Sequence, residues 1–255
     1  MLSWAAKRRL FYLAIVAGFF LVILALPLYL SLQEPASCFD KKQNQGETGV
    51  DCGGPCEGVC SLQTADLIVL WSRALQGTEG VYDAVALVEN PNPKAGVRQI
   101  AYSFELFDAD NLLVVERRGR TFVNPNSRFA IYESGIQTGE RVPVRTRFSF
   151  EGPPEWIRAE KVAPTLIVKN RVLEEESPSP KLRAVLENDS LMDARDITVV
   201  ALLFDGEDNL VGVGKTAVGE LLRESERAIT FVWSEPFASK PIRIDILPRI
   251  DATRP

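Results

Sequence analysis

The four cysteines of this 255-residue chain are the residues whose type and spacing most directly suggest chemistry. They are Cys38, Cys52, Cys56 and Cys60, and the segment around them has few large apolar side chains. In an oxidising compartment such a segment uses disulfides in place of a core, so we predict two disulfides, with three pairings open. The even spacing of the last three cysteines also suits a thiolate metal or iron–sulfur site, but thiols outside the membrane tend to be oxidised.

Oxygen-bearing side chains lie between the first two cysteines. Asp40, Asn44, Glu47 and Asp51 are interleaved with glycines, and carboxylate and amide oxygens are the ligands that calcium prefers. The spacing does not match an EF-hand, and acidic loops are usually only solvated. We therefore predict no cofactor and keep calcium at these four residues as the alternative.

The composition argues against several classes of function. The chain contains no histidine, which removes Ser-His-Asp and Cys-His nucleophile systems and zinc sites that use histidine. The sequence contains no glycine-rich phosphate-binding loop and no convincing pair of acidic residues for acid–base catalysis. The net charge of −5, from 29 basic and 34 acidic residues, argues against an extended nucleic-acid surface. We predict that the protein is not an enzyme and binds neither nucleic acid nor an evident small-molecule substrate, with a hydrolase built on a buried acid pair as the remaining enzymatic alternative.

A long apolar run precedes the cysteines and determines where they lie. Residues 10–32 carry no charged side chain, and as a helix they would extend about 34 Å, enough to cross a bilayer core of about 30 Å. Residues 7–9 are all basic, and the first acid is Glu34. The positive-inside rule therefore predicts a cytoplasmic stub at residues 1–9 and extracytoplasmic C-terminal domains. We predict an uncleaved, single-pass signal anchor whose residues 10–32 contact membrane lipid; a cleaved signal peptide is the alternative.

The cysteine segment also carries a recognisable motif. The run from Asn44 to Cys56 reads NQGETGVDCGGPC. It resembles a short cysteine module of secreted or surface bacterial proteins, with the pattern C…NGxETxxDCGGxC, in which Gln45 replaces the first glycine. The resemblance implies an exported location and no particular activity.

Short runs rich in β-branched and aromatic residues fill the rest of the chain. They are separated by Gly, Pro, Asn and Asp, which is typical of an antiparallel sandwich. In the first half, strands are expected at residues 66–72, 85–90, 100–107, 112–115, 120–123, 129–132, 144–150 and 156–162.

The second half of the chain repeats landmarks of the first. Leu87-Val-Glu-Asn90 recurs as Val185-Leu-Glu-Asn188, and Phe104-Glu-Leu-Phe-Asp108 recurs as Ala201-Leu-Leu-Phe-Asp205. We therefore predict a cysteine-rich segment at residues 33–62 followed by two sandwiches. Their expected bounds are 63–162 and 163–255.

The repeated motif resembles the name motif of the FxLYD domain, an immunoglobulin-like sandwich of bacterial and archaeal envelope proteins. The matching residues are Phe104, Leu106, Phe107 and Asp108 in the first copy and Leu203, Phe204 and Asp205 in the second. Phe stands for Tyr in both copies, and Ala201 replaces the first Phe of the second. Residues 89–92 also resemble the NPN signature of the related water-stress and late-embryogenesis-abundant sandwiches. The resemblance implies an all-β fold: two tandem immunoglobulin-like antiparallel β-sandwiches, here preceded by a single N-terminal transmembrane helix and a small disulfide-rich segment.

The motif residues need no ligand to explain them. Phe104 and Leu106 share one face of a strand by two-residue periodicity and are expected in the core. Asp108 and Asp205 are expected to start turns and accept backbone N–H bonds. Calcium at these hairpin tips is the alternative.

These features together predict a non-catalytic, membrane-anchored protein of a bacterial cell envelope, with a role in protein interaction or scaffolding. Its partners would be unknown envelope proteins. The alternative is an accessory subunit of a membrane-embedded secretion, pilus or transport complex.

Overall fold

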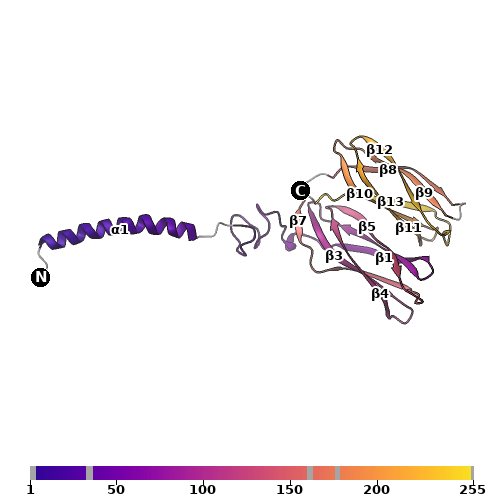
Figure 1. Ribbon diagram of the computed structural model, residues 1–255, viewed down its shortest axis with the longest axis horizontal. Coiled ribbons are helices and arrows are strands. Elements are labelled where there is room, and N and C mark those ends of the chain that lie inside the picture. The colour runs from indigo at the N-terminus through magenta and orange to yellow at the C-terminus, as the bar shows by residue number, and fades with distance from the viewer. Residues whose placement is uncertain (1–3, 33–36, 160–162, 176–178, 254–255) are drawn as a thin grey trace. The chain divides into compact units, whose positions relative to one another are not determined.

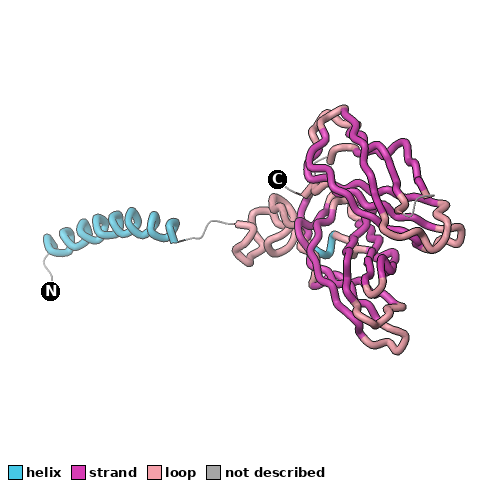
Figure 2. The backbone as a smooth tube through the Cα atoms, turned by 45° about the vertical axis from the view of Figure 1, so that its right-hand side comes forward, coloured by secondary structure: helices cyan, strands magenta, loops and turns pink. Residues whose placement is uncertain are grey.

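The computed structural model describes residues 4–32, 37–159, 163–175 and 179–253, and combines one long helix with β-structure (Figures 1 and 2). The chain divides into two compact units, Met1–Cys56 and Glu57–Pro255. This confirms the predicted all-β fold behind a single N-terminal apolar helix and a disulfide-bonded segment.

The helix α1 spans Trp4–Leu32. Its stretch Ala6–Tyr29 is long and apolar enough to cross a membrane by length and composition, a test that a signal sequence also passes, and none of that stretch is buried. The helix begins before the apolar run because Ala, Lys and Arg are good helix formers. The described part of the predicted stub, residues 4–9, is therefore helical and continuous with the apolar run.

The rest of the first unit, residues 37–56, consists of turns with a bridge between Gly49 and Cys52. Gly53 and Gly54 both adopt a positive φ, and a Cβ on Gly54 would lie 2.1 Å from the carbonyl oxygen of Gly46. Only glycine fits such a close approach, so the Cys-Gly-Gly sequence follows from the tight path of the loop.

The second unit begins with two sheets that pack around one core. Their orders are β1-β2-β5 and β4-β3-β6, with β7 pairing β3, and all these pairs are antiparallel. The strands are β1 (Ile68–Thr78), β2 (Val81–Asn90), β3 (Ala95–Phe107), β4 (Leu113–Val123), β5 (Ser127–Gln137), β6 (Arg145–Glu151) and β7 (Trp156–Arg158). Phe104 and Leu106 are fully buried in this core, as their spacing predicts.

Two further sheets of the second unit pack around a separate core and have the same strand order. They run β8-β9-β12 and β11-β10-β13. The strands are β8 (Leu166–Glu174), β9 (Lys181–Asn188), β10 (Ala194–Phe204), β11 (Leu210–Leu221), β12 (Ser225–Val232) and β13 (Arg243–Arg249). Leu203 lies in this core. The expected boundary at residues 162 and 163 adjoins residues 160–162, which are outside the described part of the chain.

Two predictions about strands are wrong. The strand expected at residues 156–162 ends at Arg158 as β7, Ala159 is not in a strand, and residues 160–162 lie outside the described part of the chain. Residues 113–115 and 120–123, expected in two strands, belong to the single strand β4, although charged residues and Gly119 separate them, and Leu112 precedes that strand. A Cβ on Gly119 would lie 2.3 Å from the hydroxyl oxygen of Tyr102. The glycine therefore marks a close approach inside a strand rather than a break, and β4 tolerates arginines because it is an edge strand.

Candidate functional site

The cysteines form disulfides. Cys38 is bonded to Cys56, with their Cα atoms 5.7 Å apart, and Cys52 and Cys60 are disulfide-bonded as well. Two disulfides are thus confirmed, and the fold selects one of the three possible pairings. No free thiol is left among the four cysteines for a metal or an iron–sulfur cluster.

The three carboxylates among the predicted calcium ligands already have partners within their loop, whereas the buried Oδ1 of Asn44 has no hydrogen-bond partner among the described residues. Asp40 accepts hydrogen bonds from the Asn44 side-chain amide at 2.7 Å and from the Lys42 N–H at 2.9 Å. The bond from Asn44 keeps the pKa of Asp40 below its usual value. Asp51 accepts the N–H of Lys41 at 3.1 Å. These carboxylates therefore hold the loop in shape.

Glu47 is the buried acid of this loop. It accepts the N–H groups of Asn44 and Asp51, each at 3.3 Å. Its Oε1 also lies 3.1 Å from Sγ of Cys56, a disulfide sulfur that has no hydrogen to donate. Among the described residues, Cys38, Glu47 and Cys56 come close enough together to hold an ion, but their two sulfurs are bonded to each other.

The turn aspartates lie at the ends of β3 and β10. Asp108 accepts the N–H of Leu112 at 2.9 Å, and its ion pair with Arg141 lowers its pKa. Asp205 accepts the N–H groups of Glu207 and Asn209, both at 2.9 Å, and the bond from Asn209 is the main reason that its pKa is lowered. Both carboxylates stabilise their turns.

The aromatic residues that precede these aspartates differ between the copies. Phe107 lies beneath the guanidinium of Arg145, which is 4.7 Å from the ring centre. Phe204 is only 3% exposed and meets the edge of Trp71, with ring centres 6.1 Å apart. Phe204 therefore belongs to a contact between the two sandwiches.

That contact is an apolar core shared by the sheets β1-β2-β5 and β11-β10-β13. In Figure 1 the labels of β1 and β5 lie beside those of β10, β11 and β13. Its buried members are Val85, Ala130, Val200, Leu202, Phe204, Leu210 and Val213. This surface was not predicted from the sequence. The signal was present in residues 199–204, VVALLF, since an apolar run without alternation indicates a strand buried on both faces.

Arg249, in β13, also contacts the first sandwich across this apolar core, which we call the seam between the sandwiches. Its guanidinium lies 3.8 Å from the ring centre of Phe122 and 4.1 Å from that of Phe129. It donates to Oγ1 of Thr121 at 2.9 Å and to the carbonyl of Phe122. Burial lowers the pKa of Arg249 to about 9, which leaves it charged at neutral pH. A desolvated cation between two rings is a strong, directional contact.

Two clefts open along this seam and share Tyr132 and Lys215 as lining residues. The first has a volume of about 310 Å³, and Trp233 and Phe237 lie in its wall. The second, of about 220 Å³, is lined by Arg120 and Arg249 among others. Both clefts combine aromatic and charged side chains, with Trp233 and Lys215 in the first and Phe122 and Arg249 in the second.

The aromatic wall of the first cleft depends on glycines in β11. A Cβ on Gly212 would lie 2.7 Å from the Phe237 ring, and one on Gly214 would lie 3.2 Å from the Trp233 ring. Trp233 also donates its Nε1–H to the carbonyl of Val213 at 2.8 Å. The alternating glycines therefore allow two rings to lie against the strand.

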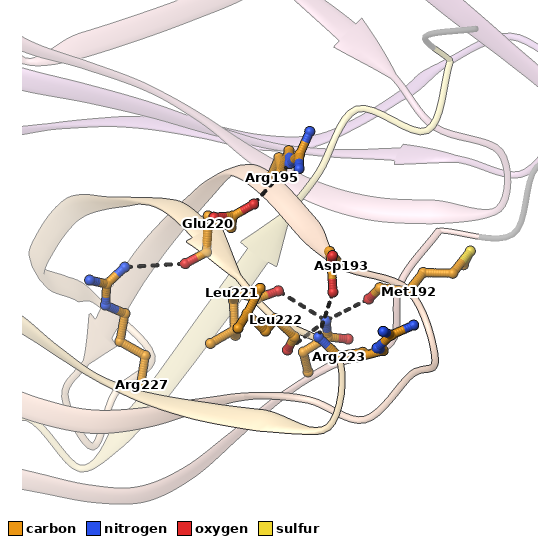
Figure 3. Close-up of polar contacts among 9 residues, drawn as sticks. Met192, Asp193, Arg195, Glu220, Leu221, Leu222, Arg223 and Arg227 are labelled. Carbon is orange, nitrogen blue, oxygen red and sulfur yellow. Dashed lines mark hydrogen bonds and ion pairs between the residues drawn. The ribbon is translucent and has the colours of Figure 1, made fainter.

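Asn188 holds together loops at one end of the second sandwich, where Figure 3 labels the carbonyl-bearing residues Met192, Leu221 and Leu222. Its side-chain amide donates to the carbonyl oxygens of Met192 at 2.7 Å and of Leu221 and Leu222 at 3.2 Å each, and Asn188 is fully buried. Asn90 does the same in the first sandwich, where its amide donates to the carbonyl oxygens of Ala95 at the start of β3 and of Asn124, each at 2.8 Å. The repeated asparagine is thus a structural element and not a ligand site.

Comparisons with known proteins do not assign a family. No family model matches the chain, and no curated protein matches it. A solved structure, red sea bream transglutaminase, aligns with 74% of this chain and 30% of its own length, at 11% identity and a TM-score of 0.23. A likeness this weak carries no argument about activity.

Proposed function

We propose that this chain is a non-catalytic, membrane-anchored protein of the cell envelope that presents its two sandwiches as one rigid body to other envelope proteins. The apolar helix α1 and the disulfide-bonded segment support the anchor and the extracytoplasmic location. The FxLYD-like motif and the DCGGxC motif support the envelope setting.

The observation that carries a scaffolding role is the apolar core between the sandwiches. Its members come from both sandwiches and are at most 7% exposed. Burying one Val, Leu or Phe side chain contributes about 1.5–3 kcal/mol, whereas an exposed ion pair contributes about 0–1 kcal/mol. Such a seam fixes the angle between the sandwiches, so their outer faces present partner sites at a constant spacing.

Crosslinking in intact cells tests this role. A photoreactive amino acid is placed at Leu112, Val142 or Val144, exposed aliphatic positions at one end of the first sandwich. We expect one or a few envelope proteins to be captured above background. The variant Arg249→Ala is expected to loosen the contact between the sandwiches. At equal abundance of the two proteins in the membrane, it should capture less of these envelope partners. Capture of abundant neighbours alone, at background level, contradicts a scaffold.

The location has its own test. In exported protein, maleimide should label none of the four cysteines until a reductant is added, because both disulfides are formed. Labelling without reductant contradicts the extracytoplasmic assignment. Replacing residues 10–32 by an unrelated apolar helix then separates the candidates: retained function contradicts the accessory-subunit alternative, and lost function with normal export favours it.

A further inference from the structure

The two clefts of the seam differ in chemistry, although they share Tyr132 and Lys215. The smaller cleft has the basic residues Arg120, Lys215 and Arg249 in its lining and no acidic residue there. In the described part of the chain, none of these three cations forms an ion pair with a carboxylate. The cleft therefore carries positive charge that the protein itself does not neutralise.

Nearby acids do not cancel this charge. Glu133 accepts the hydroxyl of Tyr102 at 2.7 Å, but it also pairs with Arg117 at 3.0 Å. Asp251 attracts Arg249 electrostatically but does not line the cleft. The buried Nε–H of Arg249 has no hydrogen-bond partner among the described residues. A bound anion would balance a desolvated cation of this kind.

The larger cleft has the character of a sugar site. Trp233 and Phe237 supply flat apolar faces, with their ring centres 5.1 Å apart in an edge-to-face arrangement. Gln76 and Ser134 supply neutral polar groups to its lining, and Asp83 and Glu235 supply carboxylates that can accept sugar hydroxyl groups. Asp83 is held in place by the Tyr132 hydroxyl at 2.7 Å. Apolar faces with a few fixed polar groups suit a ligand that has both a flat hydrophobic side and hydroxyl groups.

We propose that the seam between the sandwiches binds an anionic oligosaccharide, with a carboxylate or phosphate in the cleft of Arg120, Lys215 and Arg249 and a sugar ring against Trp233 and Phe237. Lys215 lies where the two clefts meet, with its Nζ 5.4 Å from the ring centre of Tyr132. Because Lys215 lines both clefts, its ammonium group would pair with the negative charge of a ligand that spans them. This binding does not depend on the scaffolding role proposed above.

Binding is measured by calorimetry on the full-length protein in a polyoxyethylene-ether detergent, whose headgroup carries neither charge nor sugar. The three probes are a short oligogalacturonate, its neutral methyl ester, and a glycerol-phosphate oligomer that has charge but no sugar ring. We expect the oligogalacturonate to bind about tenfold more tightly than its ester, because ionic hydrogen bonds are lost in the ester. Equal binding of acid and ester, or no binding of either, overturns the proposal.

Variants separate this site from general attraction to a charged surface. Lys215→Gln should weaken oligogalacturonate binding about tenfold. Lys94→Gln removes the same charge at an exposed position outside both clefts and should leave it unchanged. Phe237→Leu should weaken the oligogalacturonate and not the glycerol-phosphate oligomer, with the urea midpoint checked for folding. Equal effects of the two lysine variants contradict the site, and tighter binding of the glycerol-phosphate oligomer contradicts the sugar assignment.

Discussion

Replacing Asn188 is the most direct test of how the second sandwich holds its loops. The amide has two hydrogens and meets three carbonyl oxygens, and its own oxygen accepts the Ser190 hydroxyl at 2.6 Å. Asn188→Ala leaves these groups without a partner in a site closed to water. At a net of about 0.5–1.5 kcal/mol for each hydrogen bond, we expect unfolding free energy to fall by about 2–4 kcal/mol.

Asn188→Asp is the sharper variant because it keeps the shape and removes the donor. One carboxylate oxygen would keep the hydrogen bond from Ser190, but the oxygen that replaces the amide nitrogen would face three carbonyl oxygens, so the acid must protonate or the loops must open. We expect a loss at least as large as that of Asn188→Ala. For a unit of this size, about 2–4 kcal/mol corresponds to a drop in Tm of roughly 5–15 °C.

The assay is urea unfolding of the full-length protein in detergent, followed by β-sheet circular dichroism and tryptophan fluorescence. Asn170→Asp is the matched control, because Asn170 is exposed and has a positive φ of 51° that aspartate also tolerates. It should change stability by less than about 0.5 kcal/mol. If Asn188→Asp is equally harmless, the hydrogen-bond reasoning is refuted.

Three further outcomes are expected. Arg249→Ala should lower the unfolding free energy by about 2–4 kcal/mol through lost ring contacts and charged hydrogen bonds, and separate urea transitions of the two sandwiches would show a loosened seam. Gly212→Val should cost about 1–3 kcal/mol by overpacking against Phe237, whereas Gly219→Val, in open space on the same strand, should be near neutral. Asp108 has a lowered pKa, so its stabilisation is complete above about pH 4 and is lost as pH falls through the folded pKa. Asp108→Asn should therefore flatten the decline of Tm with acid, and an unchanged pH profile would contradict this.

Several elements follow from local pattern. Residues 10–32 had to be helical if they meet a bilayer, because an apolar run of that length cannot satisfy its backbone otherwise. The alternation around Phe104 and Leu106 placed both in a core, and they are fully buried. The cysteine spacing indicated two disulfides without their pairing, since pairing depends on the path of the loop between them.

The seam between the sandwiches was not predicted, and the reason is physical. The motif positions Phe107 and Phe204 have the same sequence context, yet one lies under Arg145 at an outer face and the other is buried against Trp71. The pattern of apolar residues along a strand indicates that one face of the strand is buried, but it does not indicate which other part of the protein packs against that face. Arg249 shows the same limit, because a single arginine in a strand gives no sign that two rings from the other sandwich enclose it.

What this sequence determined by itself is therefore what acts over short range: an apolar helix, a cysteine segment that needs disulfides, strands with a buried face, and turns started by Asp108 and Asp205. Only the tertiary structure decided the partner of Cys38, the burial of Phe204 and the clefts around Lys215. The burial of Phe204 and the clefts around Lys215 depend on segments far apart in the chain, whose approach is set by the packing of whole sheets. The partner of Cys38 depends on the path of the loop that leads to Cys56, 18 residues away.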